Sequence, residues 1–157
     1  VPGIEFIEFD SDLVLDEDRF REEVERVIRQ EEELLGRGVT VAVYTKRKLL
    51  SLDNDSPEAA LVRSVKISDA VQSLVGRLKV TPAFVMAKGG ITSSDVGTKA
   101  LQVKKATVLG QIRPGIPVWK TGEESRFPGI PYIIFPGNVG EADTLKEAVG
   151  ILMGGLQ

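Results

Sequence analysis

Apolar and polar positions follow changing periodicities along the chain, and each change predicts a new element. Residues 4–9 alternate apolar and acidic side chains, which is typical of a strand with one buried face. From residue 17 to about residue 37, apolar residues recur every three or four positions, which predicts an amphipathic helix. Its apolar stripe consists of Phe20, Val24, Val27, Ile28, Leu34 and Leu35. The opposite face is rich in Glu and Arg, and we interpret Glu31–Glu33 as part of this solvated face.

A second strand and a second helix follow. Residues 39–44 are β-branched and nearly all apolar, as in a strand of a sheet that is covered on both faces. A helix is predicted from Pro57 to about residue 78, because Ser56 can cap it and proline suits the first helical position. The residues predicted to form its buried stripe are Leu61, Val65, Val71, Leu74, Val75 and Leu78.

The C-terminal half continues the alternation of strands and helices. Strands are predicted at residues 83–87, 103–109, 116–119 and 132–135, with helices at 93–101 and 141–153. This order predicts an α/β fold, specifically a three-layer helix–sheet–helix sandwich with a largely parallel or mixed sheet. Domains commonly contain about 100–150 residues, so we expect residues 1–157 to form a single domain.

Composition excludes several kinds of chemistry. The chain has no Cys and no His, so thiolate nucleophiles, imidazole bases and His-ligated zinc sites cannot be built from it. Its formal net charge is −3, which disfavours nucleic acid as a partner. No apolar run approaches the ~18 residues of a membrane span, so we expect no membrane partner and a cytoplasmic location.

A glycine turn at residues 88–95, K-G-G-I-T-S-S-D, leads from a predicted buried strand into a helix. Adjacent glycines allow positive φ and a close approach of the backbone to a ligand, and the amides at a helix start attract anions such as phosphate. Thr92, Ser93 and Ser94 add hydroxyl groups, and Thr92 with Asp95 fits a capping box. The alternative interpretation is an ordinary turn from strand to helix.

A second glycine turn at residues 136–140, P-G-N-V-G, also follows a predicted strand and precedes a helix. Ligands of open parallel sheets bind beyond the carboxyl ends of the strands. If the two preceding strands are parallel, both turns lie at one edge of the sheet and can share a ligand. Taken alone, this turn too is explained by a helix start.

The loop at residues 122–131 is a third candidate, because long loops beside a rigid sheet often line sites. Candidate polar contacts are Glu123, Glu124 and Arg126, and candidate stacking residues are Trp119 and Phe127. The alternative is a surface loop that its prolines and aromatic residues hold in place.

The motifs G-G-I-T-S at 89–93, P-G-I-P at 114–117 and P-G-N-V-G at 136–140 resemble, in this order and spacing, the C-terminal nucleotide-binding domain of the four-carbon acid sugar kinase family. The resemblance runs from about Val39 to the end of the chain. It implies ATP as donor, Mg²⁺, and phosphorylation of a threonate- or erythronate-like acid. Many members have a lysine just before the later turn, where this chain has Phe135-Pro136, so we expect Lys88 to supply that charge. The nucleotide or phosphate contacts so predicted are Lys88, Gly89, Gly90, Thr92, Ser93, Gly137, Asn138 and Gly140.

Nothing in the chain resembles the N-terminal, acid-sugar-binding half of these kinases. We therefore expect the nucleotide-binding half of a two-domain kinase, inactive by itself, whose sugar substrate and general base come through the missing domain, and a homodimer is a possible assembly. Asp95 and Asp143 are weak candidates for Mg²⁺ ligands. Two alternatives are a non-catalytic nucleotide-binding regulatory module and a dinucleotide-dependent oxidoreductase domain, although the latter's G-x-G-x-x-G motif is missing.

Overall fold

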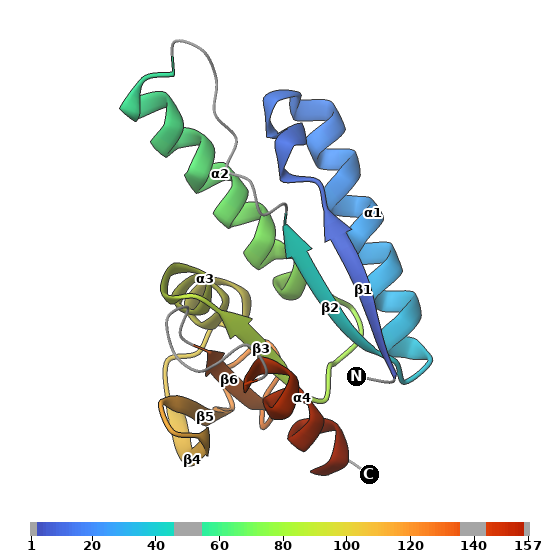
Figure 1. Cartoon of the computed structure of the whole chain (residues 1–157), viewed down its shortest axis with the longest axis vertical. Coiled ribbons are helices and arrows are strands. Elements are labelled where there is room, and N and C mark those ends of the chain that lie inside the picture. Colours follow the sequence, from blue (N-terminus) through green and yellow to red (C-terminus); the bar gives the residue numbers. More distant parts are fainter. Residues whose placement is uncertain (1–2, 46–54, 136–143, 156–157) are drawn as a thin grey trace. The chain divides into compact units, whose positions relative to one another are not determined.

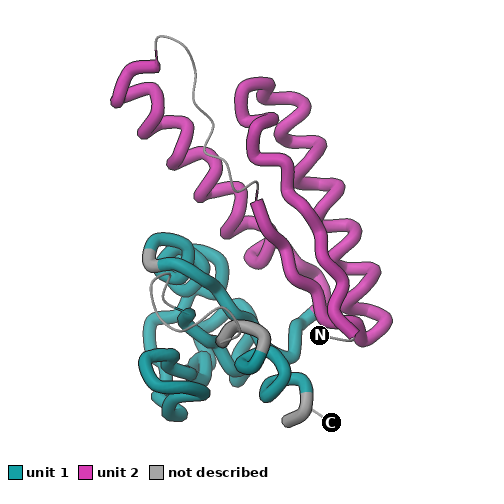
Figure 2. The backbone as a smooth tube through the Cα atoms, in the orientation of Figure 1, with its two compact units in different colours: residues 1, 81–157 teal, residues 2–80 magenta. Residues whose placement is uncertain are grey.

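The computed structural model describes residues 3–45, 55–135 and 144–155. Contacts within the chain divide it into two compact units, which are distinguished by colour in Figure 2. We call residues 2–80 the N-terminal unit and residues 81–157 the C-terminal unit. Each unit has its own sheet.

The N-terminal unit consists of two parallel strands and the helices that follow them. Its elements are β1 (Ile4–Phe9), the 3-10 helix η1 (Ser11–Leu15), α1 (Glu17–Gly36), β2 (Thr40–Thr45) and α2 (Pro57–Gly76). The strands pair in parallel from Ile4 opposite Thr40 to Phe9 opposite Thr45. The predicted cap of α2 is confirmed, since the Ser56 hydroxyl accepts the Ala59 N–H at 3.1 Å.

Apolar side chains of both strands and both helices form the core of this unit. Its buried members are Ile7, Phe9, Val24, Val27, Ile28 and Leu74. The predicted stripe of α2 is therefore only partly buried. Leu74 and Leu78 are buried, whereas Leu61 is 65% exposed and Val65 is 50% exposed. The stripe is continuous along the helix, but only its C-terminal part packs into this core.

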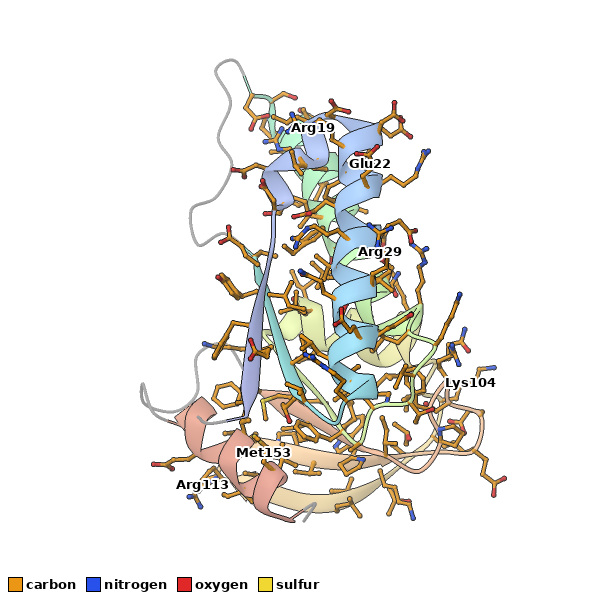
Figure 3. The ribbon with its side chains drawn as sticks, turned by 90° about the vertical axis from the view of Figure 1, so that its right-hand side faces the viewer. Arg19, Glu22, Arg29, Lys104, Arg113 and Met153 are labelled. Carbon is orange, nitrogen blue, oxygen red and sulfur yellow. The ribbon has the colours of Figure 1, made fainter. Side chains whose placement is uncertain are left out.

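Charged residues cover the outer face of α1, as predicted, and Figure 3 labels Arg19, Glu22 and Arg29 there. Glu31 and Glu23 are exceptions, because they are only 5% and 8% exposed. Glu31 lies four residues after Val27 and three after Ile28, which places it on the same face as these core residues. The interpretation of Glu31 as a solvated residue was wrong.

The C-terminal unit contains a four-stranded mixed sheet. Its elements are β3 (Val85–Lys88), α3 (Gly90–Asp95), the π-helix η2 (Val96–Ala100), β4 (Ala106–Arg113), β5 (Ile116–Thr121), β6 (Pro131–Phe135) and α4 (Thr144–Gly155). The strand order is β3-β6-β5-β4, with β3 and β6 parallel and the other pairs antiparallel (Figure 1). One core cluster of this sheet consists of the buried residues Ile116, Val118, Ile133 and Phe135.

The predicted α/β class is confirmed, with both parallel and mixed pairing. In the described residues the strands belong to two sheets, whereas the alternation of elements had suggested one. That residues 1–157 form a single domain stays a prediction. No helix in the described ranges combines the length and apolarity needed to cross a lipid bilayer.

Candidate functional site

The carboxyl ends of β3 and β6 lie side by side. Lys88 and Phe135 are the last register pair of these parallel strands, and the Gly89 N–H donates to the Phe135 carbonyl at 2.8 Å. The parallel arrangement required for a site shared by both glycine turns is thus confirmed. The second turn follows Phe135 directly in the sequence, but Gly137, Asn138 and Gly140 lie outside the described residues. Their contacts stay predictions.

The first turn depends on the backbone conformation of Gly89. Its φ is 97° and its ψ is 149°, a region that essentially only glycine adopts. The positive φ falls on Gly89, while Gly90 already belongs to α3. The Ser93 N–H donates to the Gly89 carbonyl at 2.9 Å, which is the first hydrogen bond of the helix. The N–H groups of residues 90–92 lie before it in the sequence. Amides in that position carry partial positive charge and can bind an anion.

The helix begins three residues earlier than predicted, and the capping box proposed for Thr92 and Asp95 is wrong. The N-cap is Gly89, no side chain caps the helix, and Thr92 lies inside the first turn. The left-handed conformation of Gly89 turns the chain within one residue, which leaves no need for a hydroxyl cap. Asp95 instead forms an ion pair with Lys99, with 3.8 Å between Oδ1 and Nζ.

Ser93 lies in the interior. Its side chain is buried, and its hydroxyl donates to the Ala87 carbonyl of β3 at 3.1 Å. A direct contact between this hydroxyl and a ligand would require that bond to break. The arrangement therefore favours a supporting role for the Ser93 side chain at the turn, and its contact with phosphate stays a prediction.

Two exposed side chains border the turn on either side. The Lys88 ammonium nitrogen lies 5.8 Å from the centre of the Phe135 ring, at the edge where both strands end. Ile91 is 77% exposed and was not among the predicted contacts. An apolar residue in the first turn after two glycines was the signal that could have identified it. Together they offer a positive charge and an apolar surface beside the amides of residues 90–92.

The loop at residues 122–131 is fixed to the unit by hydrogen bonds. The Glu124 carboxylate accepts the N–H groups of Lys104 at 2.9 Å and Lys105 at 2.7 Å, and these backbone bonds hold its pKa below the usual value. Phe127 is buried, and its carbonyl accepts the Thr121 hydroxyl at 2.7 Å. Phe127 is therefore not available to stack on a base, and the alternative of a loop held by its own residues is favoured.

The described residues contain no group of three or more acidic side chains that could hold a metal ion. Asp95 is engaged with Lys99, and Asp143 lies outside the described ranges. Magnesium commonly keeps several waters and binds through one or two carboxylates together with substrate phosphates. A magnesium ion at this turn therefore stays a prediction.

Comparison with known proteins gives a family and a fold. Residues 2–145 match the family described as "Nucleotide-binding C-terminal domain". A Haemophilus influenzae protein has a similar structure, with a TM-score of 0.67 and 22% identity over 93% of this chain and 34% of that one. A domain of unknown function from Bordetella bronchiseptica, a domain-swapped dimer with bound citrate, has a TM-score of 0.65 and 22% identity over 93% of this chain and 34% of that one. The chain thus spans about a third of the length of these structures, and no curated protein sequence matches it.

Proposed function

Because the chain belongs to the family of nucleotide-binding C-terminal domains, we propose that it is the ATP-binding half of a kinase for a four-carbon acid sugar. The family match confirms the resemblance seen in the three glycine motifs. The observation that carries the proposed site is the parallel pair β3 and β6. Lys88 and Phe135 are the last register pair of these strands, so the first glycine turn begins at the edge of the sheet where β6 also ends. The second turn follows Phe135 in the sequence.

Phosphoryl transfer requires positioning of the nucleotide and neutralisation of charge, and little covalent chemistry from the protein. The amides of residues 90–92 and the Lys88 ammonium are the groups that would meet the phosphates. Magnesium, when bound with ATP, would add further positive charge on the phosphate oxygens. The similar structures are about three times as long as this chain. We propose that the acid sugar and the general base come from an additional domain of such a longer protein. The chain by itself would then bind ATP without phosphorylating a sugar acid.

Calorimetric titration with ATP, with adenosine and with NADH tests this proposal, using wild type, Lys88→Met and Lys104→Met. Lys104 is an exposed lysine of the same unit and serves as the matched control. A charge-assisted hydrogen bond contributes ~1.5–3 kcal/mol. Lys88→Met should therefore lower the affinity for ATP by ~10- to 150-fold and the affinity for adenosine much less. Wild type that binds no ATP would refute the proposal, and binding of NADH alone would favour the oxidoreductase alternative.

We also propose a homodimer in solution. The support is the Bordetella relative, which is described as a domain-swapped dimer. Sedimentation equilibrium over a range of concentrations checks this assembly independently of nucleotide binding, and a monomer at all concentrations would contradict it.

A further inference from the structure

Tyr132 joins the centre of β6 to the helical segment after the glycine turn. Its side chain is 2% exposed, and its hydroxyl donates to the Ser93 carbonyl. The same carbonyl also accepts the backbone N–H of Val96 within the helical segment. The Tyr132 hydroxyl thus ties this carbonyl, and with it the helical segment, to the centre of β6.

The helix changes its form directly after this contact. α3 ends at Asp95 and continues as the π-helix η2, in which the Leu101 N–H donates to the Val96 carbonyl at 2.8 Å. Gly97 makes room for the ring, because a Cβ at this position would lie 3.3 Å from Tyr132 Cε1.

Ser93 is the point where the two strands and the helix meet. Its hydroxyl is bound to Ala87 of β3, its carbonyl to Tyr132 of β6, and its N–H to Gly89 at the start of the turn. Gly89 is itself bound to the end of β6 through Phe135. Residues 90–92 therefore lie between two anchored positions, and their amides are held in one orientation before any ligand arrives.

We propose that Tyr132 is a positioning residue for nucleotide binding, which acts through Ser93 to aim the amides of residues 90–92 at the phosphates. The inference rests on the proposed function. A binding segment that is already ordered loses less conformational entropy when it binds a ligand. Removal of the hydrogen bond from Tyr132 to Ser93 should therefore lower the affinity for the ligand. The anchor is independent of pH in the neutral range, because burial raises the pKa of Tyr132 to about 12 and the hydroxyl stays protonated.

The test uses Tyr132→Phe, which removes the hydroxyl and keeps the ring. We expect ATP and inorganic tripolyphosphate to bind about tenfold more weakly, and adenosine to bind as in wild type. The control is Thr121→Val, which removes another buried hydroxyl of the same unit, one that donates to Phe127 and not to the turn. This control should leave ATP affinity within about twofold of wild type, even where its thermal midpoint falls as far as that of Tyr132→Phe.

Amide hydrogen exchange of the free protein gives a readout that does not depend on nucleotide. Exchange at Gly89 and at Ser93, whose N–H groups donate to the Phe135 and Gly89 carbonyls, should be faster in Tyr132→Phe and unchanged in Thr121→Val. If Tyr132→Phe does not fold, Gly97→Ala decides, since its Cβ crowds the Tyr132 ring from the helix side and should also weaken ATP and tripolyphosphate.

The results distinguish a failure of the role proposed for Tyr132 from a failure of the proposed function. Wild type that fails to bind ATP refutes the proposed function and, with it, the role of Tyr132 toward nucleotide. Wild type that binds ATP, together with a folded Tyr132→Phe that binds ATP equally well, overturns the positioning role and leaves the function in place. A loss of adenosine affinity as large as the loss for ATP also overturns it, because the anchor would then support the whole unit and not the phosphate-facing amides.

Discussion

Replacing Glu31 by glutamine should stabilise the N-terminal unit, and the gain should grow with pH. The Glu31 side chain is almost fully buried, and its Oε1 has no hydrogen-bond partner among the described residues. Burial raises its pKa from the ordinary 4.5 to about 8, and the neighbouring charge of Glu32 adds to the effect. Glutamine has nearly the same shape and never ionises, so the substitution isolates the cost of keeping a carboxyl group in this position.

The sign of the pH dependence follows from the two pKa values. The unfolded chain releases the Glu31 proton above about pH 4.5, while the folded chain retains it up to about pH 8. The unfolded state therefore binds fewer protons within this window, and stability falls as pH rises from about 4.5 to about 8. Each unit of pH between the unfolded pKa and neutrality costs ~1.4 kcal/mol, so the loss is roughly 3 kcal/mol at pH 7 and roughly 1 kcal/mol at pH 5.

Urea unfolding followed by far-ultraviolet circular dichroism at pH 5, 6, 7 and 8 measures this difference. The control is Glu22→Gln, since Glu22 is an exposed residue of the same helix (Figure 3). The free energy gained by Glu31→Gln should increase from pH 5 to pH 7, while Glu22→Gln should track wild type. A gain that is the same at every pH would show that Glu31 ionises normally in the folded protein, and a loss of stability at all pH values would show that its carboxyl group makes a favourable contact.

Three further predictions concern the backbone and the caps. Gly89→Ala should lower stability by ~1–3 kcal/mol in thermal unfolding, because residue 89 has φ 97°, and unchanged stability would mean that the turn can relax. Gly90→Ala is the matched variant within the helix and should not lower stability in the same assay, because alanine has the higher helix propensity. Ser56→Ala should cost ~1 kcal/mol through loss of the cap of α2, with Ser56→Asp retaining most of that stability in urea unfolding.

Local patterns were sufficient for most of the N-terminal unit. The strand at residues 4–9 has the predicted bounds, and the helix from Glu17 ends within a residue of the predicted position. These elements are determined by periodicity and by caps, which are properties of neighbouring residues. The same patterns did not show that the first half of α2 is exposed, because an apolar stripe does not specify how much of its length meets a partner. Glu31 was predicted to be solvated because it is charged, although its spacing places it on the buried face of α1.

The candidate site shows the same division between local and distant information. The glycine turn and Lys88 were predicted from adjacent residues, and the parallel pairing of β3 and β6 has confirmed the arrangement on which they depend. The bond between Tyr132 and Ser93 joins residues 39 positions apart, and no periodicity or motif encodes it. The Ser93 hydroxyl, which was predicted as a ligand contact, is bound to Ala87 inside the unit, and its contact with phosphate stays a prediction.

In the proposed site, the ligand-facing groups are mainly backbone amides, which explains how a chain without histidine or cysteine can serve phosphate chemistry. Backbone amides have no side chain of their own to tune, so their orientation must come from residues that hold the backbone from behind. In our proposal Ser93 and Tyr132 perform this task from the interior, and Gly97 leaves room for the Tyr132 ring. Lys88 is the single charged side chain at the predicted contacts. Substitutions at these interior residues should therefore affect phosphate affinity more than substitutions at Thr92, although Thr92 lies closer to the turn in sequence.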